Sequence, residues 1–180
     1  MDAERALLKH FLAALAYRAQ KALRGASDSF ADFRAGANLR TPHEIIWHMT
    51  GVIGYARTFF QPGVWQPERL NNFGDEVRRF HLVLEDLGGL LERETPRNGI
   101  SLEHLLQGPL ADAMTHVGQL AMLRRLAGYP VPPENFVFAA IDAGNLGPDQ
   151  AAPAAPDPGW NPDLPPPAPG KGLPEKWYQK

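Results

Sequence analysis

Apolar side chains recur at three- and four-residue steps along the first 128 residues, in four runs that each predict an amphipathic helix. The runs extend over residues 2–24, 41–60, 72–94 and 109–127. The expected core-facing side chains of the first two are Leu7, Leu8, Phe11, Leu12, Leu15, Ala19, Ala22, Ile45, Met49, Val52, Ile53, Ala56, Phe59 and Phe60. Those of the third are Val77, Phe80, Leu84, Leu87 and Leu91.

The second and fourth runs have the clearest boundary signals. Thr41 precedes a proline at the first helical position and lies three residues before Glu44, which is the pattern of a capping box. Ser101 is expected to cap a short turn over residues 102–107, which Gly108 and Pro109 interrupt, so that Pro109 begins the fourth helix. Four such helices with short or moderate connections predict an all-α protein, a four-helix bundle.

The composition changes at Gly147. Ten of the eighteen prolines lie between Pro148 and Pro174, mixed with alanine and glycine, which disfavours regular helix or sheet. The sequence therefore predicts a bundle over residues 1–146 and a Pro-rich, non-regular tail over residues 147–180. We expect this tail to lie as a strap over the bundle, anchored by the aromatic residues Trp160, Trp177 and Tyr178.

The overall composition is that of an ordinary globular protein, with 44% hydrophobic and 21% charged residues. A net charge of −2 gives no electrostatic reason to expect nucleic acid or an anionic membrane as a partner. No apolar run approaches the roughly 18 residues of a membrane helix, and the charged N-terminus does not resemble a signal peptide. The absence of cysteine excludes thiol catalysis by the protein and disulfides, and we expect a cytoplasmic location.

Two candidate metal ligands lie one turn apart on the fourth predicted helix. At about 100° per residue, Asp112 and His116 share a sector with four further side chains. These are Gln119, Leu120, Leu123 and Leu126. The leucines mark the sector as core-facing, and an isolated carboxylate in a core must be paired, protonated or bound to a metal. Asp112 could instead orient His116 by a hydrogen bond, or remain solvated near the start of the helix.

A third candidate lies on the second predicted helix. His48 is at the edge of the apolar stripe, whereas His43 falls on the opposite side and is expected to face solvent. His48 alone could be a structural core histidine. Together with Asp112 and His116, it predicts a site for one divalent metal ion.

The remaining basic side chains have no ligand pattern. His10, His81 and His104 lack a partner at ligand spacing, and Arg124 and Arg125 are expected to form a solvated edge.

Two stretches of sequence resemble a known family. Residues 41–49 (TPHEIIWHM) and 108–120 (GPLADAMTHVGQL) resemble the DinB/YfiT-like superfamily of small bacterial metal-binding helical proteins, and the resemblance extends over about residues 1–145. It implies that His48 is the first ligand and His116 the last. Asp112 stands where the family usually has its middle histidine. A set of two histidines and one carboxylate also resembles the ligands of non-haem iron, so zinc, nickel and iron are the expected ions.

The same resemblance implies a function. It suggests a metal-dependent S-transferase that acts on a small-molecule substrate, in which the metal activates a low-molecular-weight thiol such as bacillithiol, mycothiol or glutathione. A metal-dependent hydrolase and a non-catalytic metal-binding stress-response protein remain alternatives.

A second apolar face on the fourth helix requires a covering partner or segment. This face carries Leu110, Met114, Val117, Gly118 and Ala121. Either the chain's own tail or a second subunit could cover it, and we favour a two-fold homodimer, as in many members of the family.

Overall fold

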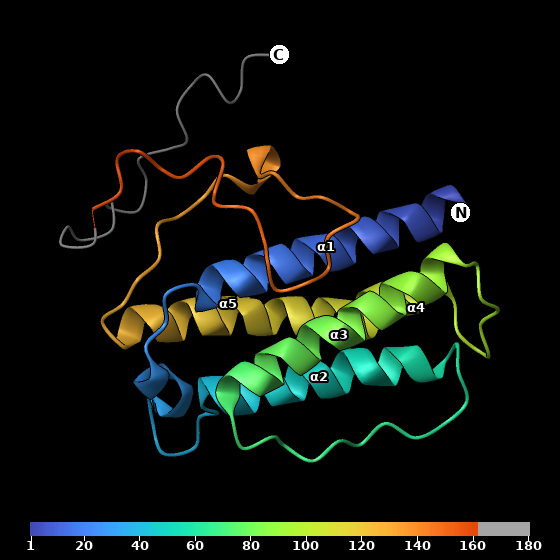
Figure 1. Ribbon diagram of the computed structural model, residues 1–180, viewed down its shortest axis with the longest axis horizontal. Helices are drawn as coiled ribbons and strands as arrows, with labels where there is room; N and C mark the ends of the chain where they lie inside the picture. The colour runs from blue at the N-terminus through green and yellow to red at the C-terminus, as the bar shows by residue number, and fades with distance from the viewer. Residues whose placement is uncertain (162–180) are drawn as a thin grey trace.

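The computed structural model describes residues 1–161 and shows an all-α bundle, which confirms the predicted fold class. Its long helices are α1 (Ala3–Leu23), α2 (Pro42–Thr58), α3 (Phe73–Glu92) and α5 (Ala111–Leu126), packed side by side (Figure 1). A short helix, α4 (Leu102–Leu105), precedes α5, and two 3-10 helices occupy Asp28–Asp32 and Phe136–Phe138. Within residues 1–161 the only β-type pairing is an isolated bridge between Glu134 and Pro156.

The helices begin where polar caps satisfy their first backbone N–H groups. At the start of α2, Thr41 Oγ1 accepts a hydrogen bond of 3.2 Å from the Glu44 amide, and Glu44 Oε2 accepts one of 2.8 Å from the Thr41 amide. This reciprocal pair confirms the predicted capping box. Asn72 caps α3 through a bond of 3.0 Å from the Asp75 amide to its side-chain oxygen.

The fourth predicted helix begins earlier than expected. Ser101 caps α4 as predicted, but Pro109 does not start a new helix. The chain remains helical from α4 into α5 through a π-helical turn, Leu106–Leu110. Proline has no N–H and its ring clashes with the preceding turn of an α-helix, and the wider π turn accommodates it without breaking the helix.

The core-facing side of α5 is rotated from the predicted one. The buried residues of α5 are Ala113, His116, Val117, Leu120, Leu123 and Arg124, a sector centred on Leu120. This centre lies about 60° from the centre of the predicted sector. Asp112 and Gln119 therefore lie at its edge, and Leu126 is exposed instead of buried. Leu7 of α1 is also exposed, because it is about 100° from the buried Leu8.

Two predictions about basic side chains are wrong. His43 is buried and not solvent-facing, because Phe73 at the start of α3 covers it with ring centroids 5.6 Å apart. Arg124 is buried and not part of a solvated edge. Its guanidinium donates hydrogen bonds to the carbonyls of Tyr129 and Arg24, and so joins the C-terminal ends of α5 and α1. Arg125 is exposed, as predicted.

The chain beyond α5 folds back against the bundle on the side of α1, while the connection over residues 59–72 runs along α2 on the other side (Figure 1). Leu146 is buried in the core, and its carbonyl lies 2.9 Å from His81 Nδ1 of α3. The first residues of the predicted tail also touch the bundle, since Arg24 donates hydrogen bonds of 2.7 and 2.8 Å to the carbonyls of Gln150 and Ala151. Trp160 is half-buried.

Part of the tail prediction falls beyond the structure. Residues Trp177 and Tyr178, expected as anchors, lie outside the described residues.

The second apolar face of α5 is covered in part by the same chain. Residues 131–134 and Phe136 border the same cavity as Met114, Val117 and Ala121, the positions that suggested cover by the tail or by a second subunit. The homodimer therefore stays a prediction, without a bare face at these positions to support it.

No helix within residues 1–161 has the length and apolar character needed to cross a membrane.

A hydrogen bond between Tyr17 and Glu134 ties the segment after α5 to α1. The buried Tyr17 hydroxyl donates to Glu134 Oε1 over 2.8 Å. Burial, and then this bond, raise the pKa of Tyr17 to about 12. The native pKa is above that of the unfolded chain, about 10, so the interaction stabilises the fold fully below pH 10. That stabilisation is lost as the pH rises through about 12.

We predict that an alkaline titration of tyrosinate absorbance shows one component near pH 12, and that this component disappears in Tyr17→Phe. The variant should also lose about 1 kcal/mol of unfolding free energy at pH 7, measured by denaturant titration. Tyr55→Phe is the matched control, since Tyr55 is exposed and its hydroxyl is not bonded to Glu134. A late component that survives in Tyr17→Phe would contradict the assignment.

Candidate metal centre

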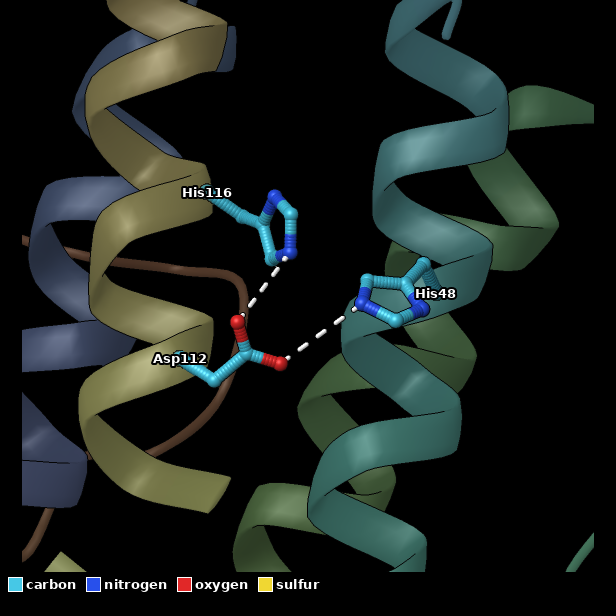
Figure 2. Close-up of side chains that lie close together, drawn as sticks. All are labelled: His48, Asp112 and His116. Carbon is cyan, nitrogen blue, oxygen red and sulfur yellow. Dashed lines mark ion pairs between the residues drawn. The ribbon is translucent and has the colours of Figure 1, made fainter. Parts of the chain in front are cut away.

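The structure brings the three predicted ligands together between α2 and α5. His48 projects from the middle of α2, and Asp112 and His116 project from the first half of α5 toward it (Figure 2). His48 Nε2 lies 3.6 Å from Asp112 Oδ2, and His116 Nε2 lies 3.4 Å from Asp112 Oδ1. One donor atom from each residue lies within 4.8 Å of the other two.

Local structure determines these positions. The capping box at Thr41 defines the first turn of α2 and thereby the direction in which His48 projects. On α5, Asp112 and His116 are four residues apart and lie one above the other on one side of the helix. This side of α5 lies at the edge of the buried sector centred on Leu120. Both groups therefore point toward α2 and away from the middle of the core.

The spacing of the donor atoms fits one small cation. A tetrahedral ion with ligand bonds of 2.0–2.2 Å holds its ligand atoms about 3.3–3.6 Å apart. Each histidine lies at such a distance from one carboxylate oxygen of Asp112, His48 at 3.6 Å from Oδ2 and His116 at 3.4 Å from Oδ1, and both distances are longer than the 2.7–3.2 Å typical of N–H···O hydrogen bonds. Two imidazole nitrogens and a carboxylate oxygen are also ligands that zinc, nickel and iron accept. The residues present therefore fit a divalent transition metal.

Gln119 orients one of the ligands. His116 Nδ1 lies 2.8 Å from Gln119 Oε1, and because this oxygen can only accept, Nδ1 carries the ring proton. The lone pair of Nε2 is then free on the side of Asp112, as in metal sites where the second ring nitrogen is held by an outer partner. The helical pattern places Gln119 in the same sector as His116 but indicates no role for it. The signal that could have found it is the amide three residues after a ligand histidine.

The three side chains differ in exposure. The side chain of His116 is 9% exposed, that of His48 33% and that of Asp112 48%, so the site is closed on the core side and open on the other. The pKa of His48 is lowered, mainly by burial and then by the charges of Arg40 and His116, while Asp112 acts in the opposite direction. The neutral imidazole favoured by these effects is the form that binds a metal.

His48 and Asp112 form part of the wall of a large cleft. The cleft has a volume of about 1420 Å3 and lies between α2, the start of α5 and two connecting loops. Its apolar lining consists of Leu39, Trp47, Val52, Tyr55, Trp65, Pro67 and Pro109. Its charged side chains, besides Asp112, are Arg34, Arg40, Glu44 and Glu68. The volume exceeds the 300–1,000 Å3 of typical small-molecule sites, so the cleft has room for more than one small ligand.

The Trp65 side of the cleft requires a glycine on α2. A Cβ atom at Gly54 would lie only 2.0 Å from Nε1 of Trp65, so the indole packs directly on the backbone of α2. The Arg57 guanidinium covers this indole at 4.7 Å from the ring centroid. This packing holds the loop that bears Trp65 against α2 and fixes the position of this part of the cleft wall.

The described part of the chain contains no second metal cluster of this kind. Within residues 1–161, no other group of three or more histidine and acidic side chains has donor atoms at ligand spacing. His10 and His104 are exposed, and His81 is buried with one ring nitrogen against the Leu146 carbonyl.

Comparisons with known proteins found no match: no protein-family profile, no curated protein and no solved structure is similar to the chain. The resemblance to the DinB/YfiT-like superfamily therefore stays a prediction. The metal site is supported only by the geometry of His48, Asp112 and His116.

We predict that the protein binds one divalent ion per chain and that Asp112→Ala weakens binding by about 100-fold or more, since it removes the only anionic ligand. The helices should stay folded, because Asp112 is half-exposed and the leucines of α5 supply the packing. Titration calorimetry with Zn²⁺ measures the affinity, and circular dichroism measures the fold. Gln119→Ala should weaken binding by about 10-fold, as expected for an outer partner.

Asp32→Ala is the control, because Asp32 is an exposed carboxylate outside the site. Equal Zn²⁺ affinities for the Asp112→Ala and Asp32→Ala variants would show that the three side chains are not a metal site.

Proposed function

We propose that the protein is a metal-dependent enzyme of the S-transferase type, which joins a low-molecular-weight thiol to a small electrophilic substrate in the cleft. The observation that carries this proposal is the half-open ligand set, with His48 and Asp112 in the wall of a cleft of about 1420 Å3. A divalent ion bound there would supply a Lewis acid that lowers the pKa of a thiol or water molecule.

The number of protein ligands supports a catalytic role over a structural one. Structural zinc sites have four protein ligands, whereas catalytic sites have three and keep one position open. His48, Asp112 and His116 supply three, and Asp112 has almost half of its side chain exposed. The open side therefore suits a reacting molecule.

Features of the cleft support a thiol brought by a separate molecule. The chain has no cysteine, so the sulfur cannot come from the protein itself. Arg40 is exposed in the cleft and forms no ion pair within the described residues, whereas Arg34 is bonded to Glu44. Arg40 is thus free to bind a carboxylate of a peptide-like thiol, and the aromatic side chains of Trp47 and Tyr55 offer an apolar surface for the electrophile.

The reaction balances without a further reagent. The thiol sulfur forms a bond to the electrophilic carbon of the substrate, the leaving group departs with the bonding electron pair, and the thiol proton passes to solvent. The protein's part is to hold both molecules next to each other, with the thiol anion near His48 and Arg40.

We predict that the Zn²⁺-loaded protein accelerates the consumption of reduced glutathione, bacillithiol or mycothiol by chlorodinitrobenzene, measured by thiol titration. Gly51→Leu should lower this rate at least about 10-fold without a change in Zn²⁺ affinity. Gly51 lines the cleft, and a Cβ there meets no atom within 4 Å, so the leucine fills the cleft and leaves the ligands in place. Gly118→Leu is the control. It introduces the same side chain on α5, on the side that faces away from the cleft, and should keep full activity.

Other outcomes would point to the alternatives. Metal-dependent hydrolysis of a nitrophenyl ester, with no thiol consumption, would identify a hydrolase that uses bound water. Tight metal binding with neither activity would identify a non-catalytic metal-binding protein.

A further inference from the structure

A second cavity lies on the other side of α5 from the metal centre. It has a volume of about 310 Å3, at the lower end of the range for small-molecule sites. Met114, Gly118 and Ala121 of α5 face it. At about 100° per residue, Met114 is about 160° from Asp112 around the helix, so the two cavities share no wall on α5.

The outer wall of this cavity is a fixed part of the structure. It consists of residues 131–134 and Phe136, the segment that folds back over α1. Glu134 Oε1 accepts hydrogen bonds from the Tyr17 hydroxyl at 2.8 Å and the Ala154 amide at 3.1 Å, and Lys21 donates to the Pro132 carbonyl. Two consecutive prolines, at 132 and 133, stiffen the segment further. The cavity is therefore held open by specific bonds between α1 and this segment.

The charges around the cavity do not balance. Arg18, Lys21 and Arg125 contribute three positive charges and Glu134 one negative charge, which leaves an excess of two positive charges. Glu134 Oε1 accepts from Tyr17 and from backbone amides, and Oε2 is buried without a hydrogen-bond partner. Arg18 has no acidic partner within the described residues, and its guanidinium lies 3.8 Å above the ring centroid of Phe136.

Burial makes this excess charge significant. It lowers the pKa of Arg18 and, as the largest of several effects, that of Lys21, which means that both cations are held partly away from water. A cation in such a position gains from an anionic partner more than an exposed one does.

The rest of the lining is apolar. Met114, Val117, Ala121, Ala22 and Val131 surround the space between α1, α5 and the covering segment. A ligand that fits must therefore combine one anionic group with a hydrocarbon body. The carboxylate suits the planar guanidinium of Arg18, and its single charge costs less to bury than that of a phosphate.

We propose that this cavity is a second ligand site, separate from the metal centre, which binds a small hydrophobic carboxylate. The carboxylate pairs with Arg18, and the hydrocarbon body packs on Met114 and Val117.

The test compares octanoate with octanol as a neutral probe of the same chain length, by titration calorimetry on the full chain. Octanoate should bind the wild-type protein at least about 10-fold more tightly than octanol. Arg18→Met keeps an unbranched stem that replaces the methylenes and Nε of arginine, but removes the charged guanidinium, and should reduce octanoate affinity to that of octanol. An unchanged affinity for octanol in this variant shows that the cavity itself is intact.

Gly118→Leu tests the location. A Cβ at Gly118 meets no atom within 4 Å, so the leucine fills the cavity without a clash, and leucine also favours helix over glycine. This variant should fold and lose octanoate binding, while Gly51→Leu in the metal cleft should bind octanoate as the wild type does.

Asp112→Ala separates this site from the metal, since a carboxylate could also bind a metal ion directly. Octanoate affinity should be the same in this variant as in the wild type. Loss of binding in Asp112→Ala, retention in Gly118→Leu, or no binding to the folded wild-type protein at millimolar octanoate would each overturn the proposal.

Discussion

The rotation of α5 about its own axis determines the position of both candidate sites. Leu120 lies at the centre of the buried side, and Leu123 and Val117 flank it. With the helix in this orientation, Asp112 and His116 lie along one edge and face α2. The opposite edge faces the segment that follows α5. A rotation of about 60° toward the predicted orientation would bury Asp112 in a leucine core, where an unpaired carboxylate is strongly unfavourable.

The sequence predicts the helices well and the rotation of α5 poorly, for a physical reason. Helix positions follow from apolar periodicity and from caps such as Thr41, which are local properties. The rotation depends on which neighbours cover which side. Because α5 is apolar on most sides, its pattern divides into a core face and a second face, and the true centre lies between them at Leu120. The pattern therefore predicts that Leu126 is buried and that Val117 is covered by the tail or by a second subunit.

The same limit explains the polar residues that were misplaced. His43 is covered by Phe73, and Arg124 by the carbonyls of the chain ends, and neither contact is visible in the pattern of a single helix. The grouping of the candidate ligands on α5 could be predicted because its signal is different. Asp112 and His116 are linked by helical spacing alone, and that spacing survives an error in the rotation of the helix.

The charges of the metal centre favour an anionic partner at its open side. A divalent ion with one carboxylate and two neutral imidazoles would leave a net charge of +1. Arg40, in the same cleft, adds a further positive charge close enough to lower the pKa of His48. With a third histidine in place of Asp112, as the resemblance implies for most of the family, the net charge would be +2. Such a centre would lower the pKa of a bound thiol more strongly, but three neutral imidazoles would attract the ion less than a set with a carboxylate. With a metal ion bound, aspartate at position 112 would favour retention of the ion over maximal acidity. Arg40 would add positive potential for an anionic partner bound in the cleft.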